Sequence, residues 1–257
     1  MAKNPHLLDF LAVQSLFNAI VINAVLIFYT LLLLQRTERD LKRQSDRAEA
    51  LVGVVLPATI ADRLRSGNET RIADRMENVS VLFADLAGFT PAAHEQPPEV
   101  VVEYLDEFVR AFDLMCETFA VEKIKTIGDA YMAVGGLHGG SLGGVIGIGR
   151  LALEMLKIQH RRAPLGDRKL ELRVGIHYGN AIAGVIGDMR ISYDLWGDAV
   201  NMASRMQSHG VPGRIQVSED YRAAAGERFL FEERGDTEIK GIGLARTFFL
   251  LGPRIKD

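Results

Sequence analysis

Residues 191–205 read ISYDLWGDAVNMASR and carry an acid, an amide and a guanidinium around the start of a predicted helix. Gly197 and Asp198 indicate where that helix begins, and we expect the Asp198 side chain to cap its free N–H groups. Asn201 and Arg205 are four residues apart, so their side chains are predicted to share one face. Small and apolar residues gather on the opposite, buried side: Ala199, Met202, Ala203 and Met206. The same offsets also fit an ordinary amphipathic helix with a solvated polar face.

Outward from this helix, predicted strands alternate with predicted helices. We predict strands over residues 79–86, 121–126, 131–134, 170–176, 181–186, 214–217, 229–233 and 246–251, and helices over residues 97–119, 142–160 and near Tyr221. Tight turns at residues 128–129 and 178–180 join two pairs of strands directly. The pattern therefore predicts an α+β fold, in which helices pack on a mainly antiparallel sheet.

The composition narrows the class of protein. The chain has 257 residues, of which 48% are hydrophobic, and a net charge of −3. It is long enough for one good-sized core with appendages, and its near-neutral balance gives no support for a nucleic-acid partner. Cys116 is the only cysteine, which excludes an internal disulfide framework and favours a reducing compartment. Its apolar helical surroundings place Cys116 in the predicted core.

Residues 11–34 contain no charged side chain. As a helix they would be about 36 Å long, enough to cross a hydrocarbon core of ~30 Å. Basic residues follow at once: Arg36, Arg39, Lys42 and Arg43. Because Lys3 is the only lysine or arginine before the apolar stretch, the bulk of the chain is predicted to be cytoplasmic. We therefore predict a short N-terminal lead segment over residues 1–10 and a transmembrane helix over residues 11–34 in the cell membrane. The alternatives are a buried core helix and a part of a larger multi-span region.

Residues 35–77 are predicted to form a helical stalk and a linker. A heptad pattern places one seam at Leu34, Leu41, Ala48 and Val55. Only about three heptads fit, so a parallel coiled coil and a monomeric solvated stalk both stay open. Pro57 ends the first helix, residues 60–64 form a short second one, and a polar linker runs to about Glu77. The globular domain then occupies residues 78–257.

Asp85 and Asp129 each stand where a predicted strand reaches a turn. If the two strands are neighbours, the carboxylates converge at one edge of the sheet, the oxygen-rich setting that Mg²⁺ prefers. Two metal ions about 4 Å apart would activate an attacking oxygen and neutralise a leaving phosphate. The turn over residues 86–90, which includes Phe89 and Thr90, would offer backbone N–H groups to phosphate. Two acids at ordinary turns are the alternative.

Four stretches with linked spacing carry a family resemblance. They are residues 83–90 (FADLAGFT), 123–129 (KIKTIGD), 173–177 (RVGIH) and 193–205 (YDLWGDAVNMASR). In their order and spacing these stretches resemble the motifs of class III nucleotide cyclases, and the likeness covers residues 79–251. The resemblance implies a ferredoxin-like catalytic fold that uses two Mg²⁺ or Mn²⁺ ions per site.

The resemblance also implies a role for each matching residue. Asp85 and Asp129 would hold the two metal ions, with the backbone carbonyl of Leu86 assisting. The 3′-hydroxyl of the nucleotide would attack its own α-phosphorus and release pyrophosphate. Asn201 would position the ribose, and Arg205 would neutralise the charge that builds on the α-phosphate.

Two further cations match shorter motifs of the same family. Lys240, in the sequence EIKG, matches a lysine for the terminal phosphates, and Arg173 matches a further phosphate contact. Because these motifs are short, either residue could instead be an ordinary surface cation.

The choice of base would rest on Lys125 and Asp194. A lysine can donate to N1 of adenine and an aspartate can accept from its exocyclic amine, whereas guanine presents the opposite pattern. Similar family members that use GTP carry an acid at the lysine position and a smaller residue at the aspartate position. The resemblance therefore implies that Lys125 and Asp194 select ATP. Lys123 lies two residues from Lys125, and we expect it on a solvated strand face.

In this family the metal-binding aspartates and the Asn/Arg helix of one site come from different chains. This chain carries each set once, so the resemblance implies a head-to-tail homodimer with two complete sites. A parallel pair of stalks would then align the two domains. The sequence thus predicts a membrane-anchored adenylate cyclase, with ATP and a second copy of the chain as partners. The alternatives are a guanylate cyclase, which Lys125 and Asp194 disfavour, and an inactive dimerisation or receptor module, which would be expected to have lost one of the metal or helix residues.

Overall fold

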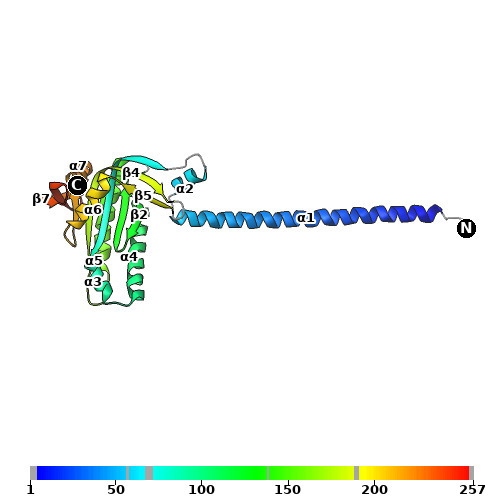
Figure 1. Cartoon of the computed structure of the whole chain (residues 1–257), viewed down its shortest axis with the longest axis horizontal. Coiled ribbons are helices and arrows are strands. Elements are labelled where there is room, and N and C mark those ends of the chain that lie inside the picture. The colour runs from blue at the N-terminus through cyan, green and yellow to red at the C-terminus, as the bar shows by residue number, and fades with distance from the viewer. Residues whose placement is uncertain (1–4, 56–57, 67–71, 138, 188–190, 255–257) are drawn as a thin grey trace. The chain divides into compact units, whose positions relative to one another are not determined.

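The computed structural model describes residues 5–55, 58–66, 72–137, 139–187 and 191–254. Its internal contacts divide the chain into two units, residues 1–68 and residues 69–257. The first unit is helical and the second is built on a sheet (Figure 1).

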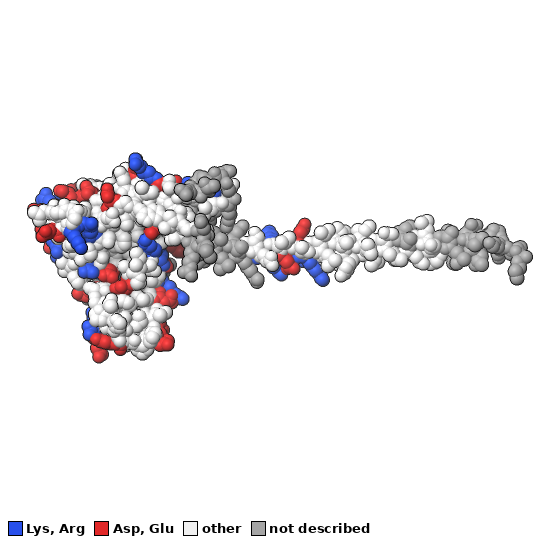
Figure 2. Space-filling model, viewed as in Figure 1, with Lys and Arg blue, Asp and Glu red and all other residues white. Residues whose placement is uncertain are grey.

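The N-terminal unit contains two helices, α1 (Pro5–Val55) and α2 (Ala58–Arg65). Within α1, the stretch Gln14–Ser45 contains an 18-residue window with a mean hydropathy of 2.3, which is long and apolar enough to cross a membrane. Figure 2 shows a length of this helix that carries neither positive nor negative side chains. The predicted transmembrane residues 11–34 lie within the continuous helix, so length and composition allow a membrane span there. Pro57, the predicted break between the helices, lies outside the described residues.

The second unit is built on an eight-stranded sheet with the order β2-β3-β1-β4-β6-β8-β7, and β5 pairs with β4. The strands are β1 (Ala73–Ala87), β2 (Glu122–Ile127), β3 (Ala130–Gly135), β4 (Glu171–Ile186), β5 (Ser192–Trp196), β6 (Ile215–Ser218), β7 (Phe229–Ile239) and β8 (Gly243–Pro253). The pairings of these strands are antiparallel, except that β4 and β6 run parallel. The predicted α+β fold with a mainly antiparallel sheet is confirmed.

Helices cover both faces of this sheet. They are α3 (Phe89–His94), α4 (Pro98–Thr118), α5 (Ser141–Arg161), α6 (Asp198–Ser208) and α7 (Glu219–Ala225), with a 3₁₀ turn (Gly226–Arg228) after α7. Buried residues of α4, α5 and α7 form one core with alternate residues of β1 and β4, such as Leu82 and Val174, and Cys116 belongs to this core as predicted. Helix α6 packs on the other face, because a side chain at Gly175 would begin 1.9 Å from the backbone nitrogen of Gln207.

The two longest strands differ from the prediction. β4 is one continuous strand of 16 residues, where the sequence predicts two strands around a turn at residues 178–180. β1 begins at Ala73, where the sequence predicts a linker. The cause is long-range pairing between these strands, which continues through a bulge at Asn78. Asn78 has φ 61°, and its N–H donates to Oδ1 of Asn180 at 3.1 Å, so residues that are typical of a turn support the bulge instead.

Candidate active site

Asp85 and Asp129 come together at one end of the sheet. Asp85 lies near the end of β1, and Asp129 lies in the turn between β2 and β3, the strand beside β1. Burial raises the pKa of Asp129 to about 6, helped by a hydrogen bond that its protonated carboxyl donates to Asp85 and by the charge of Asp85, although a backbone hydrogen bond with Leu86 opposes the shift. Two carboxyl groups close enough to share a hydrogen bond repel each other when both are ionised, so they favour a shared proton or a bound cation.

Two further side chains bind Asp85. Nη2 of Arg173 in β4 and Nε2 of Gln207 in α6 donate to its Oδ2 atom, at 3.0 and 3.1 Å. Arg173 stands directly opposite Asp85 in the β1–β4 register, so the predicted phosphate contact pairs with the predicted metal ligand. The sequence did not single out Gln207, because it lies four residues after Ala203, on the side of the helix predicted to be apolar.

Helix α6 differs from the prediction at its start. Gly197 is the N-cap and no side chain caps the helix, so the predicted capping role of Asp198 is wrong. Asp198 is already helical, and as an acid in the first turn it interacts favourably with the helix dipole. Three of the four residues predicted on the buried side are buried: Ala199, Ala203 and Met206. Met202 is partly exposed, since it borders the exposed Asn201.

The polar residues of α6 point in two directions. Arg205 and Gln207 are two residues apart, which is about 200° around the helix axis, and Gln207 faces Asp85 of its own chain. Asn201 lies one turn from Arg205, on the side away from that carboxylate. Among the described residues, no hydrogen bond or ion pair joins Asn201 or Arg205 to either aspartate. One chain therefore does not bring its acid pair together with its own amide and guanidinium.

Arg205 lies against the turn between β7 and β8. A side chain at Gly241 would begin 3.0 Å from Nη1 of Arg205, and this nitrogen is buried with no hydrogen-bond partner in the described part of the chain. Lys240, beside Gly241, is exposed. A buried donor without an acceptor is costly, so a guanidinium in this position would gain from an anion placed next to it and to Lys240.

Lys125 in β2 and Asp194 in β5 form an ion pair between Nζ and Oδ2. The other oxygen of Asp194 accepts from the backbone N–H of Leu195 at 2.8 Å. The Asp194 side chain is only 13% exposed, whereas the Lys125 side chain is 35% exposed. The two predicted base-binding residues thus meet within one chain. Lys123, which the sequence predicts on a solvated strand face, has a side chain that is 31% exposed, and its Nζ also donates to Oδ2 of Asp113 at 2.8 Å.

Phe89 and Thr90 begin helix α3 directly after β1. Gly88, with φ 80°, is the N-cap and provides no side-chain hydrogen bond. The backbone N–H groups of this first turn therefore have no partner within the helix. They follow Asp85 closely in the chain, which places the predicted phosphate-facing turn near the acid pair.

Known proteins are similar to this chain along most of its length. Residues 72–252 match the family model of the adenylate and guanylate cyclase catalytic domain. An adenylate cyclase of Mycobacterium tuberculosis is 39% identical over 220 residues, which are 86% of this chain and 50% of that protein. The atrial natriuretic peptide receptor 2 of Homo sapiens is 40% identical over 229 residues, 86% of this chain and 21% of the receptor. The chain spans half or less of the length of these relatives.

A solved structure shares the fold. The guanylate cyclase domain of RhGC from Catenaria anguillulae, in complex with GTP, matches with a TM-score of 0.68 and 26% identity. The match covers 70% of this chain and 100% of that domain. The resemblance found in the sequence and the fold class predicted from it are both confirmed. The chain belongs to the adenylate and guanylate cyclase family, and residues 72–252 are its catalytic domain.

Proposed function

We propose that this protein is an adenylate cyclase, which converts ATP to 3′,5′-cyclic AMP and pyrophosphate. The observation that carries the choice of ATP is the ion pair of Lys125 and Asp194. A lysine donor and an aspartate acceptor match N1 and the exocyclic amine of adenine. Guanine would face each of them with a group of the same kind, and each buried group left unsatisfied costs roughly 1–3 kcal/mol. Without nucleotide the two side chains satisfy each other, and an adenine would take up both.

The acid pair suits divalent cations. Mg²⁺ in nucleotide-binding enzymes is commonly held by one or two carboxylates together with substrate phosphates, and Asp85 with Asp129 supplies such a pair. Burial and the neighbouring Asp85 raise the pKa of Asp129, so a cation bound between the two carboxylates would compensate both effects. Asp85, Asp129 and the backbone carbonyl of Leu86 would hold Mg²⁺ or Mn²⁺. Such ions, when bound, would lower the pKa of the attacking 3′-hydroxyl and offset charge on the leaving pyrophosphate.

The other residues would act on the nucleotide as fixed donors. Arg205 has a buried guanidinium nitrogen that finds no acceptor among the described residues, so it can bind the charge that develops on the α-phosphate with little reorganisation. Asn201 would orient the ribose. Lys240 would bind the terminal phosphates. Arg173 would make a further phosphate contact and would leave Asp85 to do so. The first-turn N–H groups of Phe89 and Thr90 would add backbone donors to phosphate.

The two faces of α6 support a site that is shared between two chains. Gln207 occupies the side of the helix that faces the acid pair of its own chain, which leaves Asn201 and Arg205 for the acid pair of a second copy. A head-to-tail homodimer would complete two such sites about one two-fold axis. The apolar stretch of α1 would anchor this dimer to the cell membrane with the catalytic domains in the cytoplasm.

The preference for adenine over guanine is tested by replacing Lys125 and Asp194, the two residues proposed to bind the base. The wild type with Mn²⁺ is expected to form cyclic AMP from ATP in preference to cyclic GMP from GTP. In Lys125→Glu combined with Asp194→Cys, we expect this preference to be lost. Lys157→Ala is a matched control, because Lys157 pairs with Glu154 on α5, away from the acid pair. An unchanged preference in the double variant would refute the assignment, and a wild type that uses GTP better would establish the second candidate, a guanylate cyclase.

A further inference from the structure

A bulge in β2 separates two lysines that a regular strand would place together. Lys123 pairs with Ala133 of β3, whereas Lys125 pairs with Met132, so the register shifts by one residue at Ile124. Neighbouring residues of a strand point to opposite faces. The bulge therefore places Lys123 on the face of Ala133 and Lys125 on the face of Met132, whereas residues two apart in a regular strand share a face.

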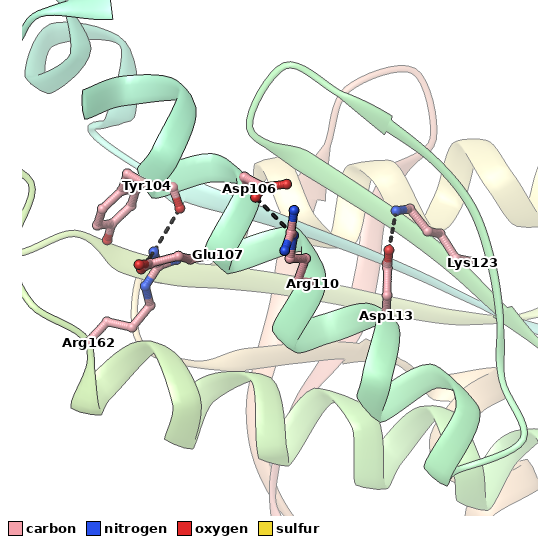
Figure 3. A network of polar contacts seen from close by, with 7 residues as sticks. All are labelled: Tyr104, Asp106, Glu107, Arg110, Asp113, Lys123 and Arg162. Atoms are coloured by element: carbon pink, nitrogen blue, oxygen red, sulfur yellow. Dashed lines mark hydrogen bonds and ion pairs between the residues drawn. The ribbon is translucent and has the colours of Figure 1, made fainter. Parts of the chain in front are cut away.

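The face of Lys123 is the one covered by helix α4. Asp113 of α4 accepts from Nζ of Lys123 at 2.8 Å and from the hydroxyl of Tyr131 at 2.7 Å, one bond on each carboxylate oxygen. Tyr131 lies in β3 and is fully buried, and the Lys123 ammonium stands 5.4 Å from the centre of its ring. Figure 3 shows Lys123 reaching from its strand to Asp113 on the helix. Asp113 thus ties β2 and β3 to α4.

Lys125 lies on the other face, where its side chain pairs with Asp194 of β5. β2 is the last strand at its edge of the sheet, so β3 alone holds its register through backbone hydrogen bonds. A slip of β2 by one residue would turn Lys125 away from Asp194 and toward α4. The pairing of Lys123 with Asp113 opposes this slip, because it holds the residue before the bulge on the helix side.

We propose that Asp113 and Lys123 are positioning residues for base selection: they hold the bulge of β2 and thereby keep Lys125 on the face where it meets Asp194. This inference rests on the proposed role of Lys125 as a reader of adenine. Neither Asp113 nor Lys123 would touch the nucleotide. Their loss is expected to act on selectivity, since ATP binding would suffer while the acid pair and α6 stay in place.

The test compares kcat and KM for ATP and for GTP in the full chain. Asp113→Asn and Lys123→Met are each expected to lower the ratio of kcat/KM for ATP to that for GTP by about tenfold, mainly through KM for ATP. Lys123→Arg keeps a cation within reach of Asp113 and should restore most of the ratio. Asp106→Asn is the matched control, because Asp106 lies two turns earlier on α4 and pairs with Arg110 of the same helix at 2.9 Å. Its ratio should not change.

Lys125→Met in the same assay separates this inference from the proposed function. If Lys125→Met leaves the ratio unchanged, the reading of adenine by Lys125 is wrong, and the positioning role falls with it. If Lys125→Met collapses the ratio while Lys123→Met does not, the reading role stands and the positioning role is refuted. Equal losses for both nucleotides in Asp113→Asn and Lys123→Met would also refute it, because that is the result of simple destabilisation. Should Asp113→Asn fail to fold, the Lys123→Met and Lys123→Arg variants decide between the two outcomes.

Discussion

Mixing two inactive variants tests the arrangement of α6 most directly. Asp85→Ala damages the acid pair, and Arg205→Ala removes the guanidinium on the opposite side of the helix from Gln207. If each site takes its acids from one chain and its guanidinium from the other, every homodimer of either variant has two damaged sites. Loss of a single preorganised donor typically lowers turnover by about 10²–10³-fold, so each variant alone should be nearly inactive.

The expected recovery follows from symmetry. When equal amounts of the two variants exchange subunits freely, half of the dimers are heterodimers. One site of each heterodimer carries both lesions, and the other is intact. The mixture should therefore regain about a quarter of the wild-type activity per chain. A site built within one chain would give no recovery, because every chain carries a lesion.

The assay measures cyclic AMP formed from ATP with Mn²⁺, and two affinity tags report on subunit exchange. Asp85→Ala mixed with Asp129→Ala is the control, because both lesions lie in the acid pair and no heterodimer of these two has an intact site. Recovery in that control would show that the activity has another source. Absence of recovery for Asp85→Ala with Arg205→Ala, after exchange has been demonstrated, would refute the shared site.

Two further predictions concern the metal-free protein and the packing of α6. The pKa of Asp129 is raised to about 6 in the fold, so this carboxyl stabilises the metal-free domain at low pH and loses that contribution as the pH rises through 6. Mn²⁺ binds the ionised form, so it should raise Tm more at pH 7.5 than at pH 5, and Asp129→Asn should abolish the difference; equal Tm shifts at both pH values in the wild type would contradict this. Gly175→Ala should destabilise the domain by about 1–3 kcal/mol or more in urea unfolding, since the new carbon would begin 1.9 Å from the backbone of α6. An unchanged unfolding midpoint would mean that α6 does not pack on β4 this closely.

The sequence predicted those parts of the fold that depend on local pattern. Hydrophobic periodicity placed the helices and most of the strands, and the hairpin at residues 128–129 placed Asp129 in the turn between β2 and β3. That β3 lies beside the strand of Asp85 was a condition of the predicted site, and the structure meets it. Motif spacing then identified the family. These inferences succeeded because neighbouring strands joined by a tight turn must pair, whatever the rest of the chain does.

The errors came from contacts between residues far apart in the chain. Residues 178–180 have the composition of a turn, but pairing with β1 keeps them in a strand. Gln207 lies on the apolar side of its helix, and only the packing of α6 against the sheet shows that it reaches Asp85. The bulge at Ile124 leaves no local signal, so the different surroundings of Lys123 and Lys125 could not be read from their spacing.

Helix α6 carries Gln207 on one side and Arg205 on the other, only about half a turn apart along the backbone. In a head-to-tail dimer, one copy of α6 would therefore contribute side chains to both catalytic pockets. Arg173 and Gln207 both donate to Oδ2 of Asp85. A nucleotide that draws Arg173 away would leave Gln207 as the donor to that oxygen, and any resulting shift of α6 would also move Arg205, which serves the neighbouring pocket. Occupation of the first pocket should then alter the affinity of the second, and by reciprocity the second should alter the first to the same degree.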